Sequence, residues 1–259
     1  MTAALKSTSE AATLILTLSH PGHHNALGPE IYAAGVEALN AAENNPDVRC
    51  VILTGEGRQF SAGGHLGRLQ AARSGGLEAE GQAVDSLHNW IDSLRTFPKP
   101  VIAAVEGAAA GAGFALALAC DFVVAAETAY FVVAHTRVGL SPDGGASWHL
   151  ARALPRALAT EALMRGQRLT AQQLARHGLV NQVTPEGAAL GAALQLATEL
   201  NGRAGNVLAS IKELLQEAPV QGLPAHLAAE RAHFLRNLAH PNAGEGIAAF
   251  LEKREPRFR

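Results

Sequence analysis

The sequence VIAAVEGAAAGAG, residues 101–113, decides the fold of this chain. It begins with an apolar run typical of a buried strand and ends in a loop of small residues at 107–113. The same order occurs earlier, where Val51–Thr54 precedes Phe60-Ser61-Ala62-Gly63-Gly64. Neither loop carries a charged side chain, so each offers backbone N–H groups that a ligand can approach closely. Two such groups aimed at one point form an oxyanion hole, which indicates chemistry on an activated carbonyl such as a thioester.

Apolar periodicity around these loops predicts an α/β fold. We expect strands at residues 13–18, 48–54, 101–105, 122–126 and 130–133, and helices at residues 29–43, 84–94 and 111–119. Strands that alternate with helices in this way argue for parallel or mixed sheets with helices outside them.

From about Gly144 the pattern is helical. We expect helices at residues 171–177, 188–200, 204–217 and 225–238. They are too rich in alanine to form a separate large core, so we expect them to pack on the first half of the chain and on neighbouring subunits. The segment Leu66–Gly81 is weakly patterned and contains Gly75-Gly76. It is expected to be a mobile surface segment, placed where a lid over a site would be useful.

The composition is that of an ordinary globular protein. Of the 259 residues, 48% are hydrophobic and 17% are charged, and the net charge is -2. This balance gives no reason to expect nucleic acid or an anionic membrane as a partner. The first residues lack the apolar core of a signal peptide, and no apolar run is long enough to span a bilayer. Cys50 and Cys120 have no metal-site or redox spacing, so we expect buried thiols in a cytoplasmic protein.

Six motifs in order along the chain carry a resemblance to a known family. They are Asn25-Ala26-Leu27, the loop at 60–64, the segments at 99–107 and 139–145, Leu174–Val183, and Phe250-Leu251-Glu252-Lys253-Arg254. Each motif is weak alone, but together they resemble the crotonase superfamily, also called the enoyl-CoA hydratase/isomerase family, along nearly the whole chain. The resemblance implies an α/β spiral of ββα units over residues 1–200. It also implies a C-terminal helical region, 201–259, that forms trimers or pairs of trimers.

The resemblance further implies a site for an acyl-CoA thioester. Ala62 and Ala112 are the expected N–H donors of the oxyanion hole. The residues expected to contact coenzyme A are His24, Ala26, Gly64, Phe250 and Lys253, the last across a subunit boundary. Coenzyme A enters as part of the substrate, so no separate cofactor is expected. A metal ion is not expected either, because His23-His24 has no further ligand at a suitable spacing.

The departures from the family pattern concern the reaction. Family hydratases use two glutamates, and alignment on the motifs places Ala115 and His135 at those positions. Asp143 is the carboxylate that stays in register. It resembles the aspartate of family members that act on ring-derived or aromatic thioesters: a ring-epoxide isomerase, an oxepin-CoA hydrolase and a chlorobenzoyl-CoA dehalogenase. Isomerisation or ring-opening hydrolysis of an unsaturated or ring-derived acyl-CoA therefore fits better than hydration.

Several roles stay open for the side chains of this site. Asp143 is expected to move a proton or to attack carbon directly, and it could instead cap the helix that follows it. His88 is a candidate water activator for the hydrolytic alternative, or an ordinary surface histidine. His135 either polarises the substrate or fills the space of a glutamate. A catalytically silent protein that binds coenzyme A is the remaining alternative.

Overall fold

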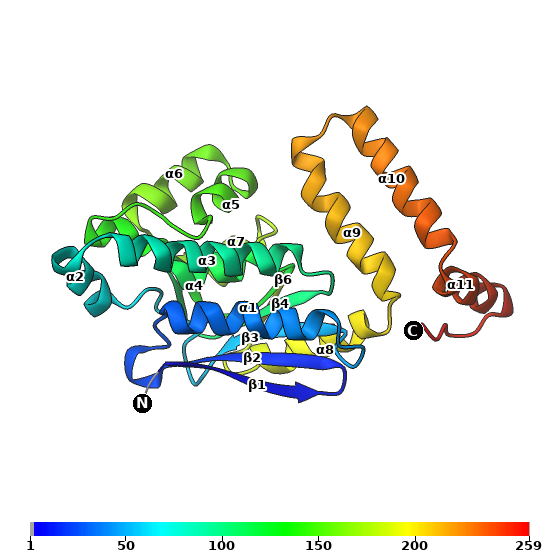
Figure 1. Cartoon of the computed structure of the whole chain (residues 1–259), viewed down its shortest axis with the longest axis horizontal. Helices are drawn as coiled ribbons and strands as arrows, with labels where there is room; N and C mark the ends of the chain where they lie inside the picture. Colours follow the sequence, from blue (N-terminus) through cyan, green and yellow to red (C-terminus); the bar gives the residue numbers. More distant parts are fainter. Residues whose placement is uncertain (1–2, 259) are drawn as a thin grey trace.

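The computed structural model describes residues 3–258 and contains two sheets (Figure 1). The larger sheet has the order β1-β2-β3-β4-β6-β9. Its strands are β1 (Ala4–Glu10), β2 (Thr13–Ser19), β3 (Cys50–Gly55), β4 (Val101–Val105), β6 (Phe122–Ala126) and β9 (Gln182–Thr184). β1 and β2 are antiparallel, and all other pairs are parallel. The predicted α/β class with a mixed sheet is confirmed.

The smaller sheet carries the second small-residue loop. Its strands are β5 (Ala108–Ala110), β7 (Tyr130–Val132) and β8 (Leu169–Thr170), in that order. β5 and β7 are parallel, and β7 and β8 are antiparallel. Its first strand, β5, lies between the end of β4 and the start of the buried helix α4 (Ala112–Ala119).

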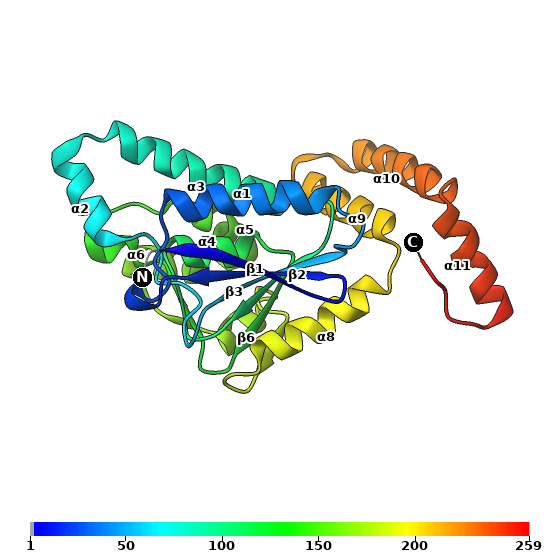
Figure 2. The same ribbon diagram turned by 60° about the horizontal axis from the view of Figure 1, so that its bottom comes forward.

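Helices cover both faces of the larger sheet (Figure 2). α1 (Pro29–Glu43) and α3 (Glu78–Thr96) lie on one face, and α8 (Ala189–Asn201) lies on the other. Alternate residues of β3 face opposite sides, as a strand requires. Val51 and Leu53 belong to the main core with α1 and α3, whereas Cys50 and Ile52 pack with the alanines of α8.

The remaining helices complete the description. They are η1 (Pro21–His23), α2 (Leu66–Gly75), η2 (Ala134–Val138), α5 (Ala146–Ala153), α6 (Arg156–Arg165), α7 (Ala171–Ala175), α9 (Gly205–Glu217), η3 (Ala218–Val220), α10 (Leu223–Leu238) and α11 (Pro241–Glu252). None of these is long and apolar enough to cross a membrane, nor is any other helix within residues 3–258.

β1 and α2 are elements that the sequence pattern did not predict. β1 was not predicted, because its polar segment Lys6–Glu10 is an exposed edge strand and shows no apolar alternation. The segment Leu66–Gly81 was predicted only as a weakly patterned, mobile surface segment, and it forms α2 and the first turn of α3. No residue of α2 is buried, which explains the missing apolar period.

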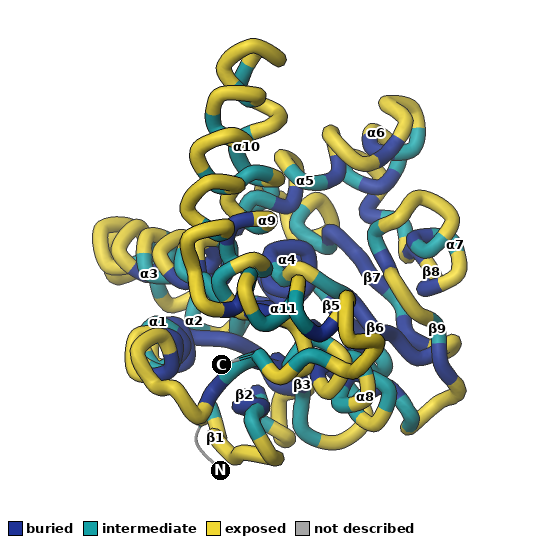
Figure 3. Tube along the Cα trace, turned by 90° about the vertical axis from the view of Figure 1, so that its right-hand side faces the viewer, coloured by how far each residue is buried: buried dark blue, intermediate teal, exposed yellow. Residues whose placement is uncertain are grey.

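α9, α10 and α11 extend away from the body of the chain (Figure 1). Figure 3 shows that α10 is largely exposed, whereas β6 and β7 are mostly buried. Large apolar side chains are exposed along these three helices: Val207, Ile211, Leu215, Leu223, Leu227, Phe234, Leu235, Leu238, Ile247, Phe250 and Leu251. Large contiguous apolar patches are rare on the surfaces of monomeric proteins.

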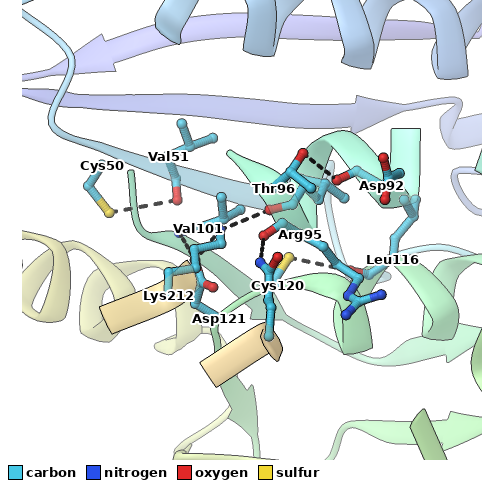
Figure 4. Close-up of polar contacts among 12 residues, drawn as sticks. Cys50, Val51, Asp92, Arg95, Thr96, Val101, Leu116, Cys120, Asp121 and Lys212 are labelled. Atoms are coloured by element: carbon cyan, nitrogen blue, oxygen red, sulfur yellow. Dashed lines mark hydrogen bonds and ion pairs between the residues drawn. The ribbon is translucent and has the colours of Figure 1, made fainter. Parts of the chain in front are cut away.

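A partly buried ion pair links α9 to the start of β6 (Figure 4). The Lys212 ammonium donates to the Asp121 carboxylate at 2.8 Å and to the Leu94 carbonyl at 2.9 Å. Burial raises the pKa of Asp121 despite this cation. The two cysteines, both in this region, are free, and burial raises the pKa of the Cys50 thiol to about 12.

Candidate active site

A tight turn after β2 holds the first small-residue loop in place. His24 and Asn25 both have left-handed backbone angles, with φ of 52° and 57°. The Asn25 side chain donates to the carbonyls of Glu56 (2.9 Å) and Gln59 (2.7 Å). The Ser61 hydroxyl in turn donates to the Asn25 carbonyl at 2.8 Å. Asparagine suits this turn because it tolerates the left-handed region and its amide can bond nearby backbone.

The hydrogen-bond pattern of the first loop leaves one N–H group free. Leu27 pairs with both neighbours of Gly64, donating to the Gly63 carbonyl and accepting from the His65 N–H. In such a parallel bridge the N–H of Gly64 points away from Leu27. It has no hydrogen-bond partner within residues 3–258. The Ala62 N–H donates to the His24 carbonyl at 2.9 Å.

This pattern corrects one expectation. Ala62 was expected to donate to the oxyanion, but its N–H is already engaged. Gly64, expected only to contact coenzyme A, has the available N–H group on this loop. Sequence reasoning missed this because backbone direction depends on the pairing with Leu27, which lies far away along the chain.

The second loop lies against the first. Ser61 bridges to Ala109, and a Cβ atom on Gly63 would lie 2.6 Å from the Ala110 oxygen and 3.3 Å from the Ala112 nitrogen. Ala112 is the first residue of α4, so its N–H lies at the positive end of the helix dipole. Two backbone donors, Gly64 and Ala112, therefore lie on adjoining loops.

A cavity of about 420 Å³ opens beside the two loops. Its lining is Tyr32, Ala62, Gly64, Leu66, Arg68, Leu69, Glu80, Ala83, Val84, Leu87, His88, Gly111, Ala134, His135, Val138, Leu140, Ser141, Pro142 and Asp143. Most of these residues are apolar or small, and the few polar side chains converge on one space. This composition is typical of a small-molecule site.

His135 and Asp143 form a hydrogen-bonded pair in this cavity. The His135 Nε2 atom lies 3.1 Å from the Asp143 Oδ1 atom. An ionised carboxylate only accepts, so Nε2 carries the proton in this contact when Asp143 is ionised. The His135 ring also lies next to Gly111, because a Cβ atom there would be 3.6 Å from the ring Cε1 atom. The pair therefore stands beside the second loop.

Asp143 does not cap the helix that follows it. α5 begins at Ala146, its N-cap residue is Gly145, and no side chain bonds the cap. Ala115 lies against this loop, since a Cβ atom on Gly144 would be 2.8 Å from the Ala115 Cβ atom. The structure thus brings together the two positions that lack glutamate, 115 and 135, with Asp143.

The other predicted residues divide into two groups. His88 lines the cavity but is exposed, and Ala26 is buried in the turn that holds the first loop. His24 is exposed on that turn. Phe250 lies near the end of α11, and Lys253 follows that helix directly. α11 lies at the opposite end of the molecule from α2, which lines the cavity (Figure 1). One chain therefore does not bring them to its own cavity.

The sequence analysis did not predict that the polar side chains of Tyr32, Arg68 and Glu80 line the cavity. Arg68 and Glu80 belong to the segment that was expected to be a mobile lid, and they form an ion pair. Tyr32 looks like an ordinary core residue of an amphipathic helix. A charged pair inside an otherwise unpatterned segment was the available signal.

Two polar residues near the loops have structural roles. The His65 Nδ1 atom accepts from the Arg68 N–H at the start of α2. Glu106 accepts from the N–H groups of Gly187 (3.1 Å) and Ala189 (3.0 Å), ahead of α8. Within residues 3–258, no group of three or more His, Cys, Asp or Glu side chains is arranged to hold a metal ion.

Comparisons with known proteins agree with this geometry. The family described as "Enoyl-CoA hydratase/isomerase" matches residues 8–259. The chain is 37% identical to 1,2-epoxyphenylacetyl-CoA isomerase from Escherichia coli K12, over 96% of this chain and 95% of that protein. It is 36% identical to 2,3-dehydroadipyl-CoA hydratase from the same organism, over 95% and 94%.

Solved structures show the same fold. A crystal structure of an enoyl-CoA hydratase from Polaromonas sp. JS666 is 66% identical, covers 98% of this chain and 99% of its own, and superimposes with a TM-score of 0.97. An enoyl-CoA hydratase structure from Geobacillus kaustophilus is 34% identical, with a TM-score of 0.91 and coverage of 98% and 97%. With adjoining N–H donors, an acyl-sized cavity and a match over nearly its full length, this chain belongs to the enoyl-CoA hydratase/isomerase family and has the crotonase fold.

Proposed function

We propose that this enzyme isomerises an unsaturated or ring-derived acyl-CoA by moving a proton through Asp143. The observation that carries the proposal is the Asp143–His135 pair, 3.1 Å apart, in the same cavity as the free N–H group of Gly64. Coenzyme A is part of the substrate, and no separate cofactor takes part.

The backbone donors would act on the thioester oxygen. Removing a proton from the acyl group places negative charge on that oxygen. The N–H groups of Gly64 and Ala112 supply hydrogen bonds to it, and the dipole of α4 adds positive potential at Ala112. A preorganised donor of this kind contributes roughly 10²–10³ in rate.

Asp143 would accept the proton and return it at another carbon. His135 donates to its carboxylate, which fixes the orientation of that carboxylate. The second carboxylate of the cavity, Glu80, is held by Arg68 and is therefore not a free base. With Ala115 fully buried beside Gly144, the cavity offers one free carboxylate, which suits proton transfer better than the two-glutamate hydration.

The test is Asp143→Asn, assayed against a panel of unsaturated and ring-derived acyl-CoA thioesters. We expect kcat/KM to fall by roughly 10²–10⁴ while the affinity for coenzyme A is unchanged. His88→Gln is the matched control on the same cavity wall, and it should retain most activity. Activity that survives in Asp143→Asn would remove this residue from the mechanism.

A hydrolytic reaction with Asp143 as nucleophile is the second candidate, because His88 lines the same cavity and is free to activate water. In that reaction an Asp143 carboxylate oxygen would attack a carbon of the acyl group and displace a leaving group from it, and water activated by His88 would then hydrolyse the resulting ester and release Asp143. His88→Gln would therefore accumulate the ester on Asp143, detectable by mass spectrometry. Tight binding of coenzyme A with no turnover of any thioester would instead favour the silent binding protein.

The protein is also proposed to act as a homotrimer or a pair of trimers in the cytoplasm. The exposed apolar side chains of α9, α10 and α11 support association. Copies of the same chain, which carry the same apolar surface, would bury these side chains in a symmetric assembly. Light scattering should then give three or six times the 26.9 kDa chain mass. A monomer at micromolar concentration would exclude this assembly.

A further inference from the structure

A polar patch interrupts the apolar wall of the active-site cavity. It consists of Tyr32 from α1, Arg68 from α2 and Glu80 from α3. The Arg68 guanidinium bonds Glu80 through both terminal nitrogens, one of them at 3.1 Å. The patch faces the space that also contains Asp143, and neither the fold nor the proposed proton transfer requires it.

The Tyr32 hydroxyl lacks a partner. Its residue is only 3% exposed and lines the cavity, yet no residue in the range 3–258 forms a hydrogen bond with it. The hydroxyl oxygen itself keeps contact with the solvent in the cavity, where a tyrosine hydroxyl usually bonds water or a ligand atom. Burial raises the pKa of Tyr32 well above its usual range, and the charges of Asp143, Arg68 and Glu80 also act on it. The phenol is therefore a neutral donor close to all three charged groups.

The ion pair is also only partly satisfied. The side chains of Arg68 and Glu80 keep 30% and 18% exposure, and the Arg68 Nε atom is buried without a partner. A hydrocarbon acyl chain in the cavity would remove water from these groups and return no hydrogen bond. An acyl group that carries an oxygen atom would replace the lost water.

Charge balance selects the kind of oxygen. Glu80 already neutralises Arg68, and Asp143 adds a further negative charge to the cavity. A carboxylate on the acyl group would add another negative charge and would be repelled by Asp143. A hydroxyl, carbonyl or ring oxygen accepts from Tyr32 or Arg68 without adding charge.

We propose that Tyr32, Arg68 and Glu80 form a specificity subsite that binds a neutral oxygen atom on the acyl group, remote from the thioester. The preferred substrates are oxygenated acyl-CoA thioesters. This inference rests on the proposed function, since it assigns the acyl end of the same site.

The test is a binding titration with saturated thioesters, which undergo no proton transfer at a double bond. The probes are hexanoyl-CoA, hexanoyl-CoA with an oxo group at carbon 4 or carbon 5, adipyl-CoA, and coenzyme A alone. We expect at least one oxo thioester to bind the wild-type protein roughly tenfold more tightly than hexanoyl-CoA. Hexanoyl-CoA that binds as tightly as both oxo thioesters, or adipyl-CoA that binds more tightly than either, would overturn the assignment.

Two variants tie the preference to these residues. Tyr32→Phe keeps the ring in place, and Arg68→Met combined with Glu80→Gln removes both charges together. Each should reduce the preference to less than about threefold while the affinity for coenzyme A stays constant. Arg73→Met, on the exposed side of the same helix, is the matched control and should keep the preference. An unchanged preference in both subsite variants would refute the inference. Failure of coenzyme A itself to bind would instead refute the proposed function.

Discussion

Gly63 is the residue on which the geometry of the two loops depends. Its φ is +85°, and a Cβ atom there would lie 2.6 Å from the Ala110 oxygen, closer than real Cβ contacts. Gly63→Ala therefore combines a left-handed strain of about 1–2 kcal/mol with a clash against backbone that cannot rotate away. The two loops must separate by several tenths of an ångström. Because Gly64 and Ala112 donate from those loops, at least one donor is then misplaced, and we expect kcat/KM to fall by roughly 10²–10³.

Gly57 provides the matched control for this substitution. Its φ is +74°, and a Cβ atom there meets nothing within 4 Å. Gly57→Ala thus introduces the same kind of backbone strain without the clash, so it should lose about 1–2 kcal/mol of unfolding free energy and retain activity. Steady-state kinetics and urea unfolding of both variants separate the two effects. Activity of Gly63→Ala within threefold of wild type, or equal losses in the two variants, would refute the reasoning.

Three further predictions concern stability, each measured by urea unfolding. Lys212→Met should lower the unfolding free energy by about 2 kcal/mol at neutral pH. Burial raises the pKa of Asp121, so acidification protonates this carboxyl, which then needs no cation. The difference in unfolding free energy between Lys212→Met and wild type should therefore shrink at lower pH. A difference that does not change with pH would contradict this. Burial and two nearby arginines lower the pKa of His149 to about 4. Between pH 7 and pH 4 the unfolded chain takes up a proton on this histidine that the folded chain does not, so the wild type should lose up to about 3 kcal/mol of unfolding free energy. His149→Gln should not show that loss. Asn25→Ala should cost about 3 kcal/mol, because it removes the side-chain bonds of the turn and strains a left-handed residue; a loss below 1 kcal/mol would exclude that role.

Sequence periodicity predicted most elements of the fold. The helix expected at residues 29–43 and the strands expected at 101–105 and 122–126 have those bounds in the structure. These elements bury apolar side chains, so their residues show the apolar periodicity from which a helix or a strand can be predicted. β1 and α2 bury almost nothing, and their residues carry no such pattern.

The site was predictable only in part. Small residues after two strands indicate where backbone donors are, but not which N–H group is free. That depends on the bridge between Leu27 and Gly64, a contact between segments that no local pattern reveals. The pairing of His135 with Asp143 likewise depends on how η2 and the following loop fold back on each other.

The exposure of α2 has a consequence for how this enzyme can change. α2 supplies cavity-lining side chains, including Arg68, yet none of its residues is buried. The His135–Asp143 pair and the backbone N–H groups of Gly64 and Ala112 lie outside α2. If these residues act as proposed, substitutions in α2 can change the range of acyl groups accepted while folding and the proposed proton-transfer residues stay intact.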